Sequence, residues 1–339
     1  MEPKTPKIVA STGHTYCCSI AESRIRQESL CTPVLPTPAS SHLQLAVEAR
    51  EEDAEQNFFK CAQWTPDGTS ILTSSADNSV RTFVVPSDLL SSTSPKTLTP
   101  YTTHLHPTSI NCVAPYPHFT LTEPSTTLYL STPNSLPTRL LNALYPSTTP
   151  TATYPLISPT TEAYYTPASL LWSSPSTFLA GTDCLIALFD VERNGQGPVT
   201  RLPTIPSKRH KMKGGGVGMR GIVSALGMQG EDAGMLAAGT WTRWVGLYDA
   251  NGMGGTVAQW SVAEAADQHA GVEEEGSRRR CGRYLCVVER KSGGLLVYDV
   301  RVTGKVVAWL EGREAWTNQR LGVDIFEGEG GLEVWAGGN

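Results

Sequence analysis

The sequence predicts an all-β protein built as a β-propeller of about six to seven blades. Three observations predict it: a three-stranded meander at 57–85, the recurrence of its hairpin along the chain, and a composition rich in turn-forming residues. The chain has 339 residues, of which 31 are Gly and 24 are Pro, and 40% are hydrophobic. This combination favours many short strands joined by tight turns around one large core.

The meander is the clearest repeat unit. Its sequence, NFFKCAQWTPDGTSILTSSADNSVRTFVV, alternates apolar and polar residues and is interrupted by the turn signals PDG (66–68) and ADN (76–78). Alternation with a period of two between turn signals predicts three antiparallel strands. A sheet of this size cannot bury its own hydrophobic face, so it needs similar sheets beside it.

The hairpin around the second turn recurs five times. The recurrences lie at 128–143, 178–191, 235–250, 284–300 and 332–339. Three of them close with an aromatic residue followed by Asp, and each of these three is followed by a Gly-led fourth strand: Phe189-Asp190, Tyr248-Asp249 and Tyr298-Asp299. Such a pair is a variant of the Trp-Asp signature of WD repeats, and we expect the aromatic ring to pack between blades. We assign the Asp side chains at 77, 183, 190, 249 and 299 to turns and blade architecture, because carboxylates accept hydrogen bonds from turn N–H groups.

Four antiparallel strands at this spacing are typical of propeller blades. We predict blades at 57–100, 107–158, 162–206, 219–263 and 269–312, and an incomplete sixth from 316. The fifth unit is the weakest, because its first segment, VEEEGSRRRCG (272–282), makes a poor inner strand.

The sixth unit lacks its two outer strands, and a propeller closes its ring by pairing its first and last segments. Residues 1–56 form an irregular N-terminal segment ahead of the propeller at 57–339. Within that segment, 7–12 and 14–21 are the spare strand material, and we expect them to supply the closing strand. The alternative is a truncated gene model with an open sheet.

Two stretches inside the propeller, 91–109 and 145–167, are rich in Ser, Thr and Pro and are predicted to be long disordered loops. His104 and His106 have a metal-chelating spacing, but they fall in the first of these loops with no third ligand nearby. A solvated loop is therefore favoured over a metal site. The sequence has no apolar run long enough for a membrane span, and no cofactor is expected.

A family resemblance adds to this interpretation. NFFKCAQWTPDGTSILTSSADNSVRTF resembles the first repeat of the telomerase Cajal body protein family, whose members are WD-repeat proteins. Later stretches are similar to further parts of the family in the right order: FLAGTDCLIALFDVERNGQGP, KMKGGGVGMRGIVSAL, AAGTWTRWVGLYD and AWTNQRLGVDIF. The region 87–167 matches poorly. The resemblance implies a nuclear scaffold, in the Cajal body or nucleoplasm, that binds small Cajal-body RNA or telomerase RNA together with ribonucleoprotein partners.

The resemblance does not identify the RNA that is bound, since yeast members of the wider family are tied to pre-mRNA splicing and small nuclear ribonucleoproteins. A cytoplasmic pool is also left open. The formal charge of −5 and the 17% of charged residues give no global attraction for nucleic acid. Any RNA contact therefore needs a local basic patch.

The segment SKRHKMK at 207–213 is the strongest candidate for such a patch, because it connects two predicted blades at one rim. Its cations are Lys208, Arg209, Lys211 and Lys213, and Arg220 follows at the entrance to the next blade. Lys and Arg contacts to phosphates carry most of the sequence-independent affinity for RNA. The alternative is a solvated loop or a nuclear-import signal.

Three further residues are candidates for RNA contact. Trp241 and Arg243 share a strand-to-strand turn, where an aromatic ring beside an Arg can stack an unpaired base. The alternatives are interblade packing for Trp241 and a structural hydrogen bond for Arg243. Arg320 lies in the polar stretch 317–320, facing the central channel or the rim, and the alternative there is a structural network between blades.

Two functions of different classes remain. The favoured one is a non-enzymatic scaffold that binds small nuclear RNA or its ribonucleoprotein. The other is a protein–protein scaffold without RNA contact, which would use its rims for peptide partners. An enzyme is disfavoured, because no catalytic grouping of residues is visible, and no small-molecule substrate is expected.

Overall fold

The computed structural model describes residues 7–13, 57–91, 94–147, 149–206, 219–228, 234–249, 254–269, 277–281, 283–328 and 331–337. These residues form strands almost throughout. The one α-helix among them is the seven-residue α2 (Ala263–His269), and it lies between two blades. The described part of the chain contains no helix with the length and apolar character needed to cross a membrane.

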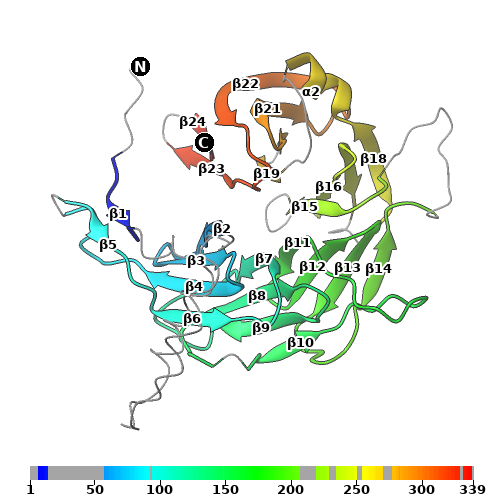
Figure 1. Ribbon diagram of the computed structural model, residues 1–339. Coiled ribbons are helices and arrows are strands. Elements are labelled where there is room, and N and C mark those ends of the chain that lie inside the picture. The colour runs from blue at the N-terminus through cyan, green and yellow to red at the C-terminus, as the bar shows by residue number, and fades with distance from the viewer. Residues whose placement is uncertain are drawn as a thin grey trace, which may run out of the picture.

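Five four-stranded antiparallel sheets succeed one another along the chain (Figure 1). The first contains β2 (Phe59–Trp64), β3 (Ser70–Ser75), β4 (Ser79–Val84) and β6 (Thr102–Leu105). The second contains β7 (Ile110–Pro115), β8 (Leu128–Pro133), β9 (Thr138–Asn142) and β10 (Ala152–Tyr154). The third contains β11 (Ser169–Ser174), β12 (Thr177–Thr182), β13 (Leu185–Asp190) and β14 (Thr200–Pro203).

Two more four-stranded sheets and one two-stranded sheet complete the propeller as far as it is described. The fourth contains β15 (Val223–Met228), β16 (Leu236–Thr240), β17 (Trp244–Tyr248) and β18 (Thr256–Ser261). The fifth contains β19 (Ser277–Cys281), β20 (Tyr284–Val288), β21 (Ser292–Asp299) and β22 (Val306–Ala315). A two-stranded sheet of β23 (Val323–Gly328) and β24 (Gly331–Ala336) follows.

The first strands of successive sheets surround a common axis (Figure 1). Contacts run from β2 to β7, β11, β15, β19 and β23 in chain order. The predicted all-β propeller is therefore confirmed. The predicted count of about six to seven blades is not confirmed, because five complete blades and one two-stranded sheet are described.

Both segments predicted to be disordered loops contain strands, so that prediction is wrong. Residues 91–109 include β5 (Lys96–Thr97) and β6, and residues 145–167 include β10. A fourth strand bonds to one neighbour only and needs few apolar side chains, which is why its sequence resembles a loop. The Thr102 hydroxyl of β6 is buried instead of solvated, and it donates to the carbonyl of Ala143 in the next blade.

The N-terminal strand does not close the ring through residues 7–12. Instead, β1 (Ala10–Ser11) pairs in parallel with β5, at the outer side of the first blade. The second spare segment, 14–21, lies outside the described residues. The weak fifth inner strand does form, since β19 pairs with the apolar β20 over all five of its residues.

The turn between the second and third strands has the same backbone geometry in all five blades. One residue in each turn has a positive φ although it is not glycine: Asn78, Ser135, Cys184, Arg243 and Lys291. A left-handed residue lets the chain reverse within two or three positions. The shared geometry shows that the hairpin recognised in the sequence is one structural unit.

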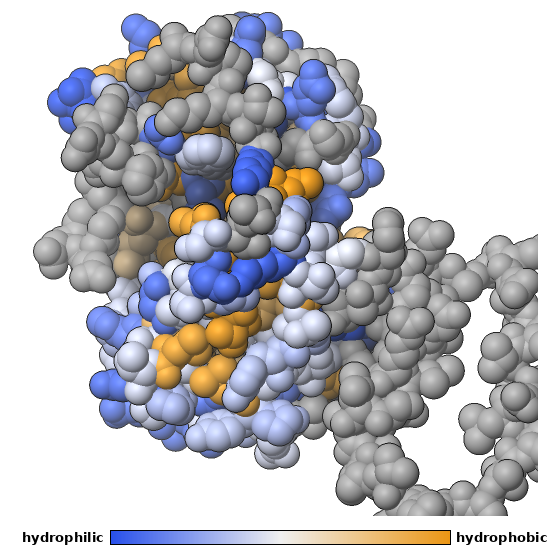
Figure 2. All heavy atoms as spheres, turned by 90° about the vertical axis from the view of Figure 1, so that its left-hand side faces the viewer, coloured by the Kyte–Doolittle hydropathy of each residue, from blue (hydrophilic) through white to orange (hydrophobic). Residues whose placement is uncertain are grey.

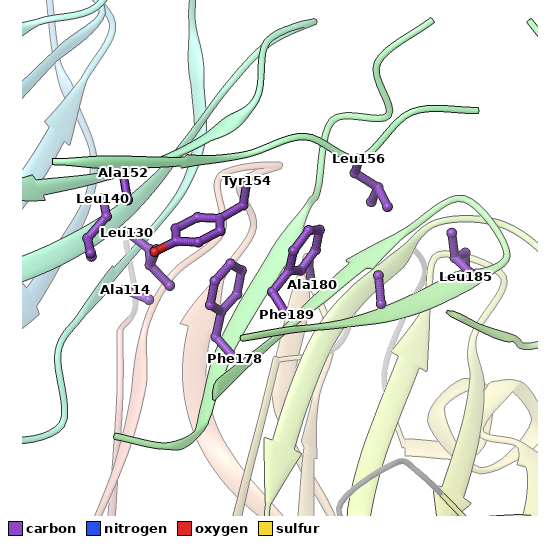
Figure 3. Packing of buried hydrophobic residues seen from close by; sticks show 11 residues of the cluster. Ala114, Leu130, Leu140, Ala152, Tyr154, Leu156, Phe178, Ala180, Leu185 and Phe189 are labelled. Atoms are coloured by element: carbon purple, nitrogen blue, oxygen red, sulfur yellow. The ribbon is translucent and has the colours of Figure 1, made fainter. Parts of the chain in front are cut away.

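Aromatic side chains pack the blades against one another, as the aromatic-Asp pairs predict. Phe189 of β13 stacks on Phe178 of β12 with ring centroids 5.0 Å apart, and Tyr154 of the second blade contacts both rings (Figure 3). Tyr248 and Tyr298 are buried in the next two interblade clusters. Each blade thus hides its hydrophobic face against its neighbour, where burial of one aromatic side chain is worth about 2–3 kcal/mol.

A buried polar network fixes the first blade. Arg81 of β4 is only 1% exposed, and its guanidinium forms an ion pair with Asp77 and donates to the Ser75 hydroxyl. Asn57 donates to the Asp77 carboxylate at 3.1 Å, and its own side-chain oxygen accepts the Asp77 N–H. This confirms the architectural role predicted for Asp77.

Hydrophobic side chains are exposed on the face that carries β1 and β5 (Figure 2). A shallow groove of about 330 Å³ lies there, between β1 and the first blade. Its apolar lining consists of Ile8, Val9, Ala10, Trp64, Ile71, Val85, Leu89 and Leu98. The N-terminal strand therefore covers part of the apolar outer side of the first blade.

Candidate nucleic-acid interface

The entrance to the fourth blade lies between two turns of one rim. Gly221 accepts a hydrogen bond from the N–H of Cys184 at 2.8 Å, so it contacts the turn of the third blade. On its other side, Ile222 accepts from the N–H of Trp241 at 3.1 Å, in the turn of the fourth blade. Blade connections and second turns therefore meet at the same rim.

The described residues on either side of the basic connection lie at this rim. The hydroxyl of Thr204, just before it, donates to the carbonyl of Met219, just after it, at 2.6 Å. The predicted phosphate-binding residues Lys208, Arg209, Lys211 and Lys213 lie between these anchors, outside the described residues. Both ends of their segment are nevertheless placed beside the turns at 183–184 and 241–242.

Two of the predicted candidates, Arg220 and Trp241, lie on neighbouring backbone segments. The Thr242 hydroxyl donates to the carbonyl of Arg220 at 2.7 Å, which ties the connection to the turn that carries Trp241. The indole of Trp241 is 41% exposed. An aromatic face at this level of exposure can pack on a neighbour on one side and accept a base on the other.

Arg243 is held by an ion-pair network between blades. Its Nε and Nη2 donate to the two carboxylate oxygens of Glu289 at 3.0 and 3.2 Å, and Nη1 lies 2.8 Å from Asp267 of α2. Burial lowers its pKa, but the hydrogen bonds and charges of Glu289 and Asp267 outweigh that effect and raise the pKa of Arg243 overall. This geometry matches the alternative stated for Arg243, a structural hydrogen bond. The carboxylates of Glu289 and Asp267 already neutralise the charge of its guanidinium.

The stretch 317–320 links distant blades across the channel. Gln319 Nε2 donates to the carbonyls of Phe59 and Lys60 in β2, at 2.8 and 3.3 Å. Arg320 Nη1 donates to the carbonyl of Ala168, just before β11, at 3.1 Å. Arg320 thus lies at the channel and takes part in the interblade network that was the alternative to RNA contact.

His104 and His106 are buried on or beside β6 and are not solvated, so the loop prediction is wrong for them as well. His104 Nδ1 lies 2.6 Å from the Tyr129 hydroxyl and its Nε2 lies 2.6 Å from the Tyr145 carbonyl. Neither nitrogen of His106 has a hydrogen-bond partner. Burial, with smaller effects of Arg139 and His104, lowers the pKa of His106 to about 3. The burial of this pair could not be predicted from the sequence, because the Thr and Pro residues around the two histidines obscure the alternation typical of a strand in THLHP.

A central channel with a volume of about 1520 Å³ is lined by residues of the inner strands β2, β7, β11 and β15. Its lining includes Trp241 and the stretch 317–320. Lys60 and Arg313 also line it, and neither was predicted from the sequence. Lys60 sits at a bulge in β2, between the pairs formed by Phe59 and Cys61, and a bulge changes where a side chain points.

The chain is similar in sequence to known proteins with two different names. No family model matches the chain. It is 26% identical over 306 residues to guanine nucleotide-binding protein negative regulator 1 of Schizosaccharomyces pombe, covering 88% of this chain and 73% of that protein. It is also 26% identical over 275 residues to telomerase Cajal body protein 1 of Mesocricetus auratus and of Homo sapiens, covering 80% of this chain.

The chain is a homologue of the telomerase Cajal body proteins. The resemblance predicted from the first repeat and the later hairpins is therefore confirmed. The chain spans about half the length of these relatives: 47% of the hamster protein and 46% of the human one.

Proposed function

We propose that this protein is a non-enzymatic nuclear scaffold that binds a small nuclear RNA, within its ribonucleoprotein, at the rim formed by the basic connection and the fourth blade. The observation that carries the proposal is the anchoring of that connection. The Thr204–Met219 hydrogen bond brings both ends of a segment with four cations to the rim that carries Arg220 and Trp241.

The physical mechanism combines charge with stacking. Lysine and arginine side chains of the connection neutralise phosphates, and the exposed indole of Trp241 offers a surface for an unpaired base. Rigid sheets on either side fix the rim, so little conformational entropy is lost in positioning these groups. Arg243 is left out of this surface, because Glu289 and Asp267 hold it.

The names of the relatives support a nuclear ribonucleoprotein role. The relatives in hamster and man are named for telomerase and for the Cajal body. Telomerase RNA and Cajal-body RNA are the cargo classes that these names suggest, and spliceosomal RNA is the cargo class that the sequence resemblance leaves open. The Schizosaccharomyces pombe relative is named as a regulator of a guanine nucleotide-binding protein, which is the protein–protein alternative that the test must separate.

The test measures binding of a fluorescein-labelled single-stranded RNA by anisotropy between 50 and 200 mM salt. Replacing Lys208, Arg209, Lys211 and Lys213 by Glu removes up to four cations that can bind phosphates. The slope of log affinity against log salt should then become shallower by about 0.7 for each phosphate that is no longer neutralised.

A matched pair of variants separates local from general charge effects. Lys208→Glu/Arg209→Glu changes one Lys and one Arg of the connection, and Lys305→Glu/Arg193→Glu changes one of each at exposed positions outside it. We expect the first pair alone to weaken RNA binding. Equal affinities and equal salt slopes for the two pairs would reject the RNA rim in favour of the protein–protein scaffold.

A further inference from the structure

The channel lining carries more cationic than acidic charge. Among the described residues, the lining includes four cationic side chains, Lys60, Arg290, Arg313 and Arg320. It also includes three acidic ones, Asp183, Glu289 and Asp324. The Glu289 carboxylate is bound by Arg243, which lies outside the lining. The lining therefore has a surplus of positive charge.

Arg320 is the cation of the lining that is best suited to bind an anion. Its Nη1 donates a hydrogen bond to the carbonyl of Ala168, which is a neutral acceptor. A guanidinium has five N–H donors in a planar fork that matches a carboxylate with two parallel hydrogen bonds. Arg320 thus holds a fixed position at the channel and has further donors to offer to an anion.

Two further cations support this site. Gln319 bonds to the backbone of Lys60, which brings the bulge of β2 next to the segment that carries Arg320. Arg313 is 6% exposed, and its guanidinium donates to the carbonyls of Gly337 and Glu289 at 3.0 and 2.6 Å. Burial lowers the pKa of Arg313, so an anion nearby would relieve an unfavourable charge.

We propose that the channel binds an acidic peptide segment of a partner protein, with a carboxylate of that segment held by Arg320 and with Lys60 and Arg313 favouring its charge. This site shares Trp241 of its lining with the proposed RNA rim, but its cations Arg320, Lys60 and Arg313 are not those of the basic connection.

The lining favours a peptide over a nucleic acid. Apolar side chains such as Leu170, Ile222 and Val323 also line the channel. A peptide that alternates acidic and apolar side chains matches both features. An RNA strand brings one negative charge for each nucleotide, which Asp183 and Asp324 would oppose.

The test uses a fluorescein-labelled peptide, Leu-Glu-Leu-Glu-Leu-Glu, with Leu-Gln-Leu-Gln-Leu-Gln as its neutral control, and measures anisotropy with the full chain. We expect the acidic peptide to bind at least about tenfold more tightly than the neutral one. Arg320→Gln should lower the affinity about tenfold and Lys60→Gln about threefold. Arg193→Gln, which changes an exposed arginine outside the channel lining, should leave it unchanged.

Lys60→Gln guards against misfolding, because Gln319 bonds to the backbone carbonyl of Lys60 and the substitution leaves that carbonyl in place. Equal binding of the two peptides, or affinities unchanged in both Arg320→Gln and Lys60→Gln, would overturn the proposal. So would competition by oligo-uridylate that Arg320→Gln abolishes, since that result makes the channel an RNA site. Charge reversal of the cations in 208–213 should weaken RNA binding and leave the affinity for the peptide unchanged. A failure of the RNA-rim proposal can therefore be distinguished from a failure of the channel proposal.

Discussion

Gln319 donates a side-chain hydrogen bond to the carbonyl of Phe59 at 2.8 Å, across 260 positions of sequence. The bond joins the segment just before the last sheet to the inner strand of the first blade. No ladder between β2 and either strand of the last sheet is present among the described residues. The side-chain amide of Gln319 therefore links the segment before the last sheet to the first blade.

Replacing Gln319 by Ala should weaken this link. The variant cannot form the two hydrogen bonds to β2, and each contributes about 1 kcal/mol, so we expect the free energy of unfolding to fall by about 1–2 kcal/mol. Urea denaturation monitored by tryptophan fluorescence measures the change. Gln259→Ala, in the outer strand β18, is the control and should cost less than about 0.5 kcal/mol. Equal decreases in both variants would show that Gln319 does not join this segment to the first blade.

Breaking the buried ion pair of the first blade should be far more costly. Asp77→Asn leaves the guanidinium of Arg81 buried without its counter-charge, and such a change destabilises by about 3–5 kcal/mol. The matched control is Lys96→Ala, which breaks the exposed pair with Asp88 and should cost less than about 1 kcal/mol. Thermal unfolding measures both variants. Similar melting temperatures would contradict the architectural role of Asp77.

His106 should make stability depend on pH. Because burial lowers its folded-state pKa to about 3, the unfolded chain takes up a proton below its ordinary pKa of 6.5 while the folded chain does not. Stability therefore decreases as the pH falls from 6.5 towards 3, by up to about 1.4 kcal/mol per pH unit. His106→Gln should flatten the dependence, and His118→Gln, at an exposed position, should not. An unchanged pH profile in His106→Gln would contradict the burial of the imidazole.

Trp241 provides a test of base stacking at the rim. Trp241→Ala should weaken binding of single-stranded RNA by about 1–3 kcal/mol, because base–aromatic stacking contributes that much, and should leave the salt slope unchanged. The control is Trp335→Ala, an indole on β24 that is also exposed. Anisotropy measures both affinities. A decrease of the same size in both variants would show that Trp241 has no specific role.

The strands with strong alternation could be predicted from the sequence, and those without it could not. The hairpins of 57–85, 178–191 and 235–250 have apolar strands around a tight turn, and they fold as predicted. The outer strands β6 and β10 could not be predicted, because they bury Thr, His and Tyr against a neighbouring blade. Tertiary packing, which no local pattern reveals, makes these segments strands.

The same distinction applies to the site. Positions at turns could be predicted, so Arg220 and Trp241 were expected near one rim and are found there. The partners of long side chains could not. Arg243 forms ion pairs with Glu289 and Asp267, which lie 46 and 24 positions further on in the sequence. Arg320 donates a hydrogen bond to a carbonyl 152 positions earlier. Such interactions depend on the arrangement of the blades around their common axis.

Whether the rim binds RNA is tested most directly by sequencing the RNA that ultraviolet light crosslinks to this protein in cells. If the rim binds RNA, one class of small nuclear RNA should be enriched, and the enrichment should disappear when Lys208, Arg209, Lys211 and Lys213 are replaced by Glu. Recovery of no RNA above that of a non-binding control protein, or the same RNA at the same yield from the charge-reversed chain, would contradict RNA binding at the rim.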